Sequence, residues 1–569
     1  MKKSLLSAFC FCLAFRGAFC RGAQELVNAG HWVYDSVEHL SMESGVVNFA
    51  DSEPMTIEEL KLYLSEIDFS SLSEAGKNEY EKIREYFEYE PVIRLSSDIF
   101  KFGIEPSLNF SAFYKSNDDI DWVYDRYERS PVIEAPVSFT LADFLTMRMD
   151  LSFGMNKNTM LKDDRYVNIP LSADDIDINF PDTGYFSIGH KITQKTGISF
   201  QLGRGMRNIG RSLNGSMIWS DHLTGVSYGQ LNIYSPDIRY SGVVSQFNVD
   251  RYMYYHQVDF RLFKKFTFTA LEGIFVNAPM ELRFLNPLTI YHGMAPWRDY
   301  DGSHEDSEGH TCAYLGLKFQ FVPVSDLKFY GMFAMTQFQT SFETSNYPDD
   351  VTPNGMGGQL GAKYNHALGK GRLTFALEGS YAQPYLYIKE SPNWSLVRTY
   401  AENMGSKHYP FYEWIGSPSG PDTVSAELDV GYEVPQKWAV NLIYLFMARG
   451  EMSEDNVFTS MTDSDTGSYA WGGLKTEIED PVSAGWCYPD TDYKSSVFPG
   501  KTAKQLQSLT TPTGIPEFVN RISIRGTYDF SSKVEFVMQP SVVFIFNNNH
   551  EEGNFDAGAE IAAACSIKF

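Results

Sequence analysis

The last twelve residues, GAEIAAACSIKF, alternate between two faces and end on an aromatic ring. Every second residue counted back from Phe569 is apolar, and the intervening positions hold all the polar groups of the segment. A period of two is typical of a β-strand whose faces meet different surroundings. The same alternation recurs from about residue 97 onward, so long two-faced strands must make up most of the fold.

The clearest hairpin is HQVDFRLFKKFTFTAL, where apolar residues such as Phe260 alternate with Asp259 and Arg261 up to a tight turn at residues 263–265. Comparable hairpins occupy residues 358–381, 425–446 and 521–539. Long polar connections separate these hairpins, at residues 156–180, 278–311, 341–356, 384–421 and 450–518. One rim of short turns and one rim of long loops is the asymmetry of an outer-membrane barrel.

Counting the alternating segments predicts about eighteen antiparallel strands. They lie near residues 98–115, 132–141, 144–155, 181–191, 197–207, 225–234, 238–248, 253–262, 266–277, 312–322, 327–340, 357–366, 372–383, 422–432, 438–449, 520–529, 533–546 and 555–569. An even number suits a closed bacterial barrel, and segments of about ten residues are long enough to cross a bilayer at a tilt. A soluble sandwich or propeller, the alternative, has shorter strands.

Composition supports a membrane barrel. Hydrophobic residues make up 43% of the chain and aromatic residues 15%, yet the mean hydropathy is only -0.27, so apolar residues are dispersed among polar ones. After residue 16, no uncharged apolar stretch approaches the roughly 18 residues of a spanning helix. In hydrocarbon, only a closed sheet pairs all its backbone groups. We therefore predict an all-β transmembrane barrel over residues 96–569, in the outer membrane, with Tyr381, Tyr432 and Trp438 near the membrane interfaces.

The N-terminus has the pattern of an export signal, which we assign to residues 1–22. Lys2 and Lys3 precede the apolar core LLSAFCFCLAF. Cleavage after Cys20 and cleavage after Gly22 both fit, and lipidation at Cys20 stays open. Few cysteines follow, which suits an oxidising compartment; Cys312 and Cys487 are candidates for a disulfide.

Residues 23–95 predict a small α-helical module, which we expect in the periplasm. HWVYDSVEHLSM has apolar residues at helical spacing, and T-I-E-E from Thr56 is a capping box before a second helix. The segment SEAGKNEYEKIREYFEYE predicts a third, strongly charged helix.

Charge and motifs exclude several functions. The net charge of -25 argues against a nucleic-acid partner. Neither a phosphate loop nor a dinucleotide fingerprint is present, and we expect no cofactor. Ser220, Asp221 and His222 are sequence neighbours, and in a strand they would point alternately, so we expect no enzyme. His304 and His310 are weak candidates for zinc ligands, because their spacing matches no established site.

Two sets of residues are candidates for function. Aromatic rings in the long connections suit stacking on the C–H faces of sugars; these are Trp297, Tyr300, Trp394, Tyr412, Trp414, Trp471 and Trp486. Charged residues on the polar face of the strands would line the lumen; these are Asp259, Arg261, Lys363, Arg372 and Glu378.

Four segments carry a family resemblance: HWVYDSVEHL, PMTIEEL, FQLGRGMRNIGRSLNGSMIWSD and FLNPLTIYHG. They resemble the helical opening, an internal stretch and the Asn-Pro segment of the outer-membrane capsule-assembly proteins of the Wzi type. The resemblance implies a periplasmic helical bundle, an eighteen-stranded barrel blocked to free passage, and a role in holding capsular polysaccharide. The long 450–518 segment and the acidity depart from the family, which puts the ligand in doubt.

The preferred interpretation is thus a non-catalytic barrel that binds or organises surface polysaccharide. The alternative is an outer-membrane channel for small solutes, since eighteen strands can enclose an aqueous lumen. The expected partners are outer-membrane lipid, surface polysaccharide, and the barrel-assembly machinery through the strand ending at Phe569. We expect a monomer.

Overall fold

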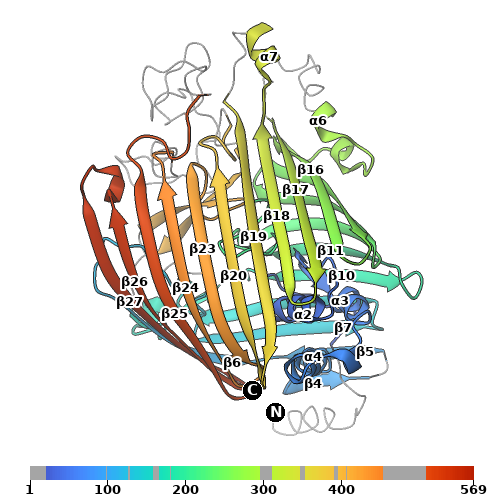
Figure 1. Ribbon diagram of the computed structural model, residues 1–569. Coiled ribbons are helices and arrows are strands. Elements are labelled where there is room, and N and C mark those ends of the chain that lie inside the picture. The colour runs from blue at the N-terminus through green and yellow to red at the C-terminus, as the bar shows by residue number, and fades with distance from the viewer. Residues whose placement is uncertain are drawn as a thin grey trace.

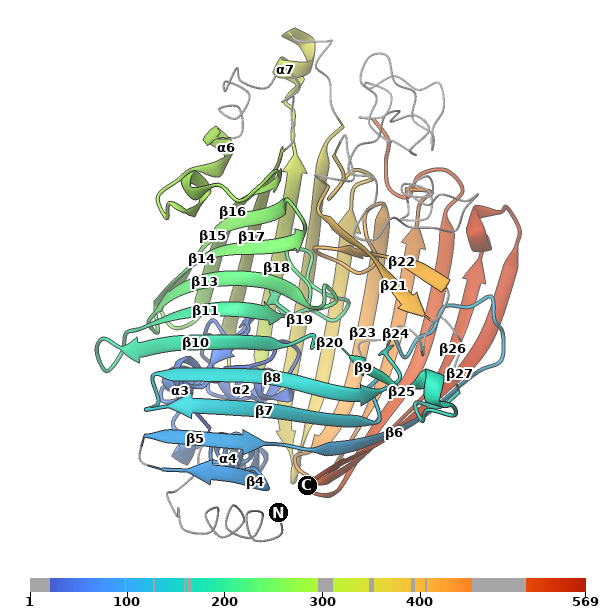
Figure 2. The same ribbon diagram turned by 180° about the vertical axis from the view of Figure 1, so that it is seen from behind.

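The computed structural model describes residues 21–569 apart from 98, 126–127, 158–159, 161–165, 180, 295–310, 347–352, 390–394, 405–406 and 453–507. The chain forms one large antiparallel sheet that curls into a barrel (Figures 1 and 2). The wall strands are β5 (Phe100–Ile104) continued by β6 (Ser107–Lys115), β7 (Ile133–Leu141), β8 (Leu145–Gly154), β10 (Gly184–Lys191), β11 (Gly197–Gly205), β13 (Val226–Tyr234), β14 (Ile238–Asn248), β15 (Arg251–Leu262), β16 (Phe266–Asn277), β17 (Thr311–Val324), β18 (Leu327–Gln337), β19 (Gly355–Leu368), β20 (Gly371–Ala382), β23 (Thr423–Val434), β24 (Trp438–Arg449), β25 (Glu517–Ser531), β26 (Val534–Phe546) and β27 (Phe555–Lys568).

The barrel closes through its last strand. β27 pairs antiparallel with β26 on one side and with β6 on the other, with Cys565 opposite both Phe536 and Phe110. β5 and β6 count as one wall strand because both pair with β7, on either side of Pro106. Two short strands, β4 (Ile93–Ser96) and β9 (Asp177–Asn179), extend the sheet at its edges. The prediction of an eighteen-stranded closed barrel is confirmed.

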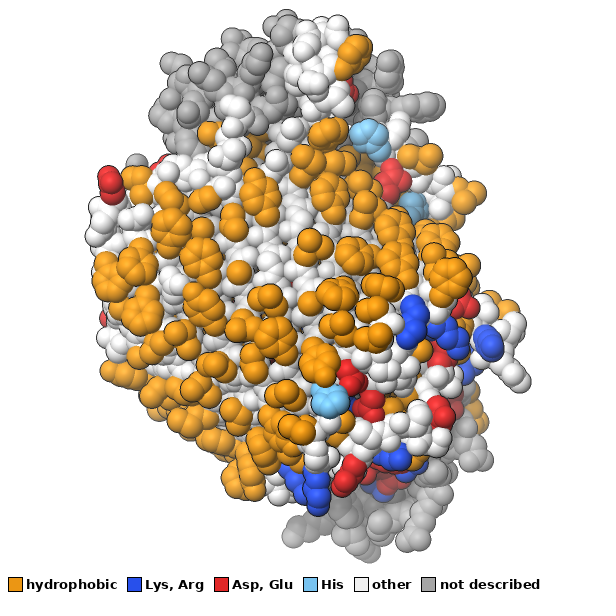
Figure 3. All heavy atoms as spheres, in the orientation of Figure 1, with side chains coloured by type: hydrophobic (Ala, Val, Ile, Leu, Met, Phe, Trp, Pro, Cys, Tyr) orange, Lys and Arg blue, Asp and Glu red, His pale blue; other side chains and the backbone are white. Residues whose placement is uncertain are grey.

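The two faces of the wall follow the alternation of the sequence. On β15, the inward residues Asp259 and Arg261 are buried, whereas Phe260 and Leu262 are exposed on the outside. Apolar side chains cover the outer wall over most of its height (Figure 3). Among the described residues, no helix has the length and apolarity needed to cross a bilayer.

Short turns join the strands at one rim. Ala142, Phe263, Lys264 and Gln436 adopt positive φ angles there, which lets the chain reverse within two or three residues. Most connections at the opposite rim are long and carry the small helices α6 (Tyr291–Met294) and α7 (Ser341–Asn346). The C-terminus lies at the short-turn rim (Figure 1).

The N-terminal segment forms the expected helices α2 (Trp32–Glu43), α3 (Ile57–Leu64) and α4 (Glu74–Phe87). Thr56 caps α3 by accepting a hydrogen bond from the N–H of Glu59, and Ser73 caps α4 by accepting from Gly76. The helices share a compact apolar core that includes Val33, Leu40, Leu60 and Ile83.

The helical module does not hang free beneath the barrel. It fills the lumen at the short-turn end, where α2 and α3 lie inside the ring of strands (Figures 1 and 2). The backbone N–H of Val47 donates to the carbonyl of Lys264 at 2.9 Å, and that of Asp326 donates to Met42 at 2.8 Å. The module thus forms the predicted helices, and backbone hydrogen bonds join it to the wall at the short-turn rim.

Candidate functional site

The candidate site is the lumen, and its lower layer is an interface between module carboxylates and wall cations. Glu38 accepts from Lys328 at 2.7 Å and from Lys363 at 3.0 Å. Burial alone would raise the pKa of Glu38, but Lys328, Lys363 and Arg211 outweigh it and hold the pKa well below its usual value. Further pairs join Arg239 to Glu59, Arg261 to Glu66, Lys318 to Asp51 and Arg372 to Glu79.

The structure places all five predicted lumen residues on the inner face. Arg261, Lys363 and Arg372 bind the module, at Glu66, Glu38 and Glu79. Asp259 accepts from Gln257 at 3.0 Å, and Glu378 binds an inward-folded loop. These residues hold the contents of the lumen in place.

That inward-folded loop, residues 206–225, forms a second layer above the module. Its short strand β12 (Asn208–Ile209) pairs with β2 (Ser52–Glu53) of the module. Arg211 forms ion pairs with Asp35 and, at 2.6 Å, with Glu53. Burial raises the pKa of Glu53 to about 7, although Arg211 opposes the rise. Most of the FQLGRGMRNIGRSLNGSMIWSD motif thus lies in this loop, which sequence reasoning could not locate.

Apolar residues seal the centre of the lumen. Trp219 of the loop is 1% exposed and joins a cluster with Tyr387, Trp414 and Ile415 from the connection between β20 and β23. The Tyr387 hydroxyl donates to the carbonyl of Met217 at 2.5 Å, and the N–H of Ser220 donates to the carbonyl of Ile415 at 2.9 Å. Two inward-folded connections therefore interlock across the barrel.

The predicted sugar-stacking residues divide into two groups. Trp414 is only 4% exposed and its ring centroid lies 6.1 Å from that of Tyr387, so it packs the lumen. The others lie outside the described residues, or in the case of Tyr412 have a side chain outside them: Trp297, Tyr300, Trp394, Tyr412, Trp471 and Trp486. The cysteine Cys312 is buried in the same apolar cluster as Trp414, and Cys487 lies outside the described residues.

A polar cavity of about 1860 Å³ remains beside the module. One side is formed by the module, including Trp32 and Tyr86, and the other by wall residues such as Asn441 and Arg525. The cavity reaches the short-turn rim at residues 531–533 and extends inward to Thr224 and Arg398. Water therefore has room to enter the lumen from the short-turn end.

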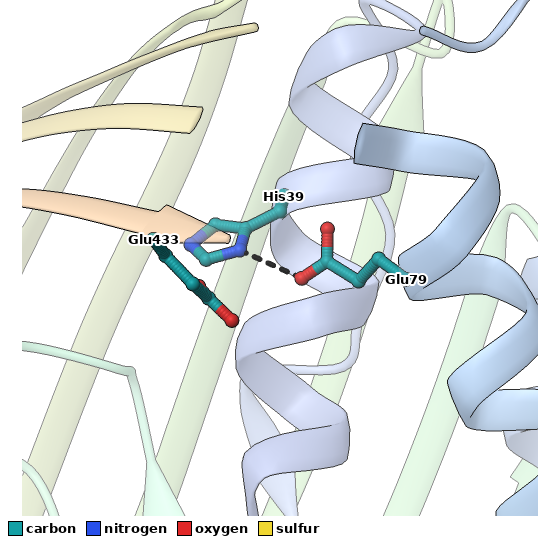
Figure 4. Close-up of side chains that lie close together, drawn as sticks. All are labelled: His39, Glu79 and Glu433. Atoms are coloured by element: carbon teal, nitrogen blue, oxygen red, sulfur yellow. Dashed lines mark hydrogen bonds and ion pairs between the residues drawn. The ribbon is translucent and has the colours of Figure 1, made fainter. Parts of the chain in front are cut away.

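His39 of α2, Glu79 of α4 and Glu433 of β23 come together beside this cavity (Figure 4). His39 Nδ1 lies 2.9 Å from Glu79 Oε1, while Arg372 Nη2 lies 2.8 Å from Glu79 Oε2. Burial would lower the pKa of His39, but Glu79 outweighs it and raises that pKa. The Arg372 guanidinium beside Glu79 disfavours a divalent cation, so we interpret this group as an anchor between module and wall. His304 and His310 lie outside the described residues.

Ser220, Asp221 and His222 lie in a turn rather than in a strand. Ser220 Oγ is 2.7 Å from His222 Nδ1, and Asp221 Oδ1 approaches the same nitrogen at 3.5 Å. A catalytic relay needs the serine and the carboxylate on opposite ring nitrogens, and Ser220 is fully buried. The trio therefore lacks the geometry of a hydrolase triad.

Fold and contents define a class: a closed antiparallel barrel of the outer-membrane type, whose lumen is filled by an N-terminal module and by inward-folded connections. The particular likeness is to Wzi, an outer-membrane protein involved in group 1 capsule assembly in Escherichia coli and described as a carbohydrate-binding β-barrel. The TM-score is 0.53 at 11% sequence identity, and the match covers 96% of this chain and 99% of that one.

Other solved barrels align less well. Pseudomonas aeruginosa OprD gives a TM-score of 0.36 at 8% identity, covering 82% of this chain and 95% of that one. The outer-membrane channel DcaP of Acinetobacter baumannii gives 0.33 at 8% identity, covering 83% and 99%. The sequence matches no protein-family model and no curated protein.

Proposed function

We propose that this protein is a non-catalytic outer-membrane barrel that binds or organises surface polysaccharide through its long-loop rim. The observation that carries the proposal is the filled lumen. A barrel meant for diffusion needs a continuous water path, whereas here the module, the 206–225 loop and the apolar cluster around Trp219 lie in series. The surfaces of such a barrel that remain available for binding are its outer wall and its two rims.

The membrane location rests on the wall itself. Side chains such as Leu373, Leu377 and Phe375 are exposed on the outer face of β20. Such a surface is costly in water and favourable against lipid. The short-turn rim then faces the periplasm, as in known outer-membrane barrels, and the module with it.

The ligand class rests on the likeness to Wzi and on the rings of the long connections. We keep Trp297, Tyr300, Trp394, Tyr412, Trp471 and Trp486 as candidates for sugar contact, and remove Trp414 because the structure buries it. Phe569 is exposed at the end of β27, which suits recognition by the barrel-assembly machinery, and we propose a monomer.

A channel for small solutes is the second candidate, and the cavity of about 1860 Å³ favours it. Purified protein in a planar bilayer and on a glycan array separates the two functions. We expect no stepwise conductance, and retention of acidic polysaccharide or another surface glycan. Conductance without glycan retention would favour the channel.

A matched pair of variants makes the glycan test specific. Trp394→Ala should weaken retention several-fold, because stacking of one ring contributes about 1 kcal/mol or more. Trp438→Ala removes an equally large ring at the short-turn rim and should leave retention unchanged. Equal effects of both substitutions would contradict sugar contact at the long-loop rim.

A further inference from the structure

The connection that follows β16 folds back onto the outside of the barrel. Residues 278–294, here called the strap, contain the 3-10 turn η3 (Leu282–Leu285) and the helix α6. Phe284 and Tyr291 of the strap pack against Tyr254 and Ile274. Those two wall residues point outward, because their neighbours Tyr255 and Phe275 belong to the cluster inside the lumen. Figures 1 and 2 both show α6 outside the ring of strands.

The strap covers a polar patch in the outer wall. Tyr240, His256 and Glu272 occupy outward positions on β14, β15 and β16. The His256 ring stacks on Tyr291 with centroids 4.5 Å apart, and the N–H of His292 donates to Glu272 Oε1 at 2.9 Å. Polar groups at these positions would otherwise face the same surroundings as Phe260 and Phe268 nearby.

The strap exposes mainly apolar side chains, and Asn286 and His292 are its exposed polar residues. Leu282 is 80% exposed and Leu288 is 88% exposed, and Met280, Leu285 and Ile290 are also exposed. The strap's two charged residues neutralise each other, since Arg283 Nε lies 2.5 Å from Glu281 Oε2. In Figure 3 the apolar surface of the wall continues up to the region of α6.

The strap also satisfies much of its own backbone. The N–H groups of Phe284 and Thr289 donate to the carbonyls of Glu281 and Asn286. The Tyr291 hydroxyl donates to the carbonyl of Phe284 at 2.8 Å. The N–H of Glu281 donates to the Tyr254 hydroxyl at 3.2 Å. Non-helical backbone needs such partners where water is absent.

We propose that the strap lies within the lipid layer, with acyl chains covering Leu282, Leu288 and Ile290, and that it shields the polar patch from those chains. The proposal rests on the outer-membrane location proposed above. Continuity with the apolar wall, internal charge neutralisation and paired backbone groups all point to lipid as the occupant, and none of them is needed by a loop in water.

A nitroxide spin label placed at Leu288→Cys, with the other cysteines replaced by alanine, tests the proposal in reconstituted vesicles of phospholipid and lipopolysaccharide. Oxygen partitions into lipid and a nickel chelate stays in water. We expect the label at residue 288 to be relaxed by oxygen more than by the chelate. Because Leu288 is 88% exposed, we expect the label to leave packing and folding unchanged.

Two matched positions make the result decisive. A label at Phe260→Cys reports on the part of the wall that the strap leaves uncovered, and oxygen should relax it as strongly as the label at residue 288. Phe342 lies on α7 in a long loop and is 73% exposed, so the chelate should relax a label at Phe342→Cys. A label at 288 that behaves like 342 overturns the strap proposal while the barrel stays in the membrane. A label at 288 shielded from both reagents shows a protein partner or second copy, and also overturns it. A water-exposed label at 260 overturns the membrane location, and the strap proposal with it.

Discussion

Glu38 on α2 and Lys328 on β18 are 290 residues apart in the sequence and form a 2.7 Å ion pair inside the barrel. Glu38→Gln would leave Lys328 and Lys363 buried with less than their full countercharge. Breaking a buried pair from one side costs about 3–5 kcal/mol. We expect the unfolding free energy to fall by about that amount, measured by denaturant unfolding followed by circular dichroism.

The exposed pair Glu81–Arg84 on α4 supplies the control, since its side chains are 34% and 56% exposed. Glu81→Gln should change stability by less than about 1 kcal/mol, because solvent screens such pairs. Combining Glu38→Gln with Lys328→Met should recover part of the loss. An effect of Glu38→Gln no larger than that of Glu81→Gln would mean that the module does not depend on this contact.

Docking of the module should depend on pH through His39 and Glu79. Glu79 raises the pKa of His39 above its usual value near 6.5, so this contribution is present below about pH 6.5 and is lost as pH rises through the folded-state pKa. Arg372 and His39 outweigh burial and lower the pKa of Glu79, so its contribution is lost as pH falls through that lowered pKa. We expect maximal thermal stability near pH 5–6.

His39→Gln should reduce the loss of stability between pH 6 and 8, as measured by thermal melts across that range; Glu53, whose pKa burial raises to about 7, keeps part of the loss. Arg372 and Glu433 also face His39 and oppose each other's effect on its charge. The control is His366, which pairs with Asp326 but is 51% exposed at the short-turn rim. An unchanged pH profile in His39→Gln, or an equal change in His366→Gln, would refute the role of His39.

The wall of this barrel could be predicted from sequence because strand periodicity is local. Asp259 and Phe260 are neighbours, and their alternation alone decides which faces inward. The contents of the lumen could not be predicted. Glu38 and Lys328 each have the sequence character of a solvated surface charge, and only the closed barrel brings them together.

The position of Trp414 could not be predicted for a related reason. Trp414 has the sequence context of an exposed ring, but the path of its connection carries it into the lumen against Tyr387. The Asn-Pro segment around Pro287 likewise reads as turn chemistry, and its position on the outer wall depends on contacts with strands distant from it in the chain. The hydrophobic pattern predicts which face of a strand or helix points inward, but it does not predict the path of a long connection.

We expect signal cleavage either just before Arg21 or just before a lipid-modified Cys20. In both cases Arg21 stays in the exported protein. Arg21 is buried, pairs with Glu25 and Glu105, and lies 4.4 Å from the ring centroid of Tyr86. A side chain on Gly22 would approach Thr140 and Thr146 to 2.5 Å, so Gly22 also packs closely against the barrel wall. We expect the intact mass of the exported protein to match a chain beginning at Arg21, or at a lipid-modified Cys20. A chain beginning at Ala23 would contradict the prediction.

Glu378 should control whether the lumen leaks. Its carboxylate accepts from the N–H groups of Leu213 and Asn214 at 3.0 and 3.2 Å, which ties the 206–225 loop to β20. Tyr330 and Gln359 bind the same carboxylate, so Glu378→Ala leaves several buried donors without an acceptor and frees the loop. We expect flickering conductance steps in planar bilayers for Glu378→Ala and none for the unmodified protein. Glu535→Ala is the control, because it removes an exposed inner-wall carboxylate away from the loop, and we expect it to show no conductance steps. Equal conductance in both variants would show that the loop does not seal the barrel.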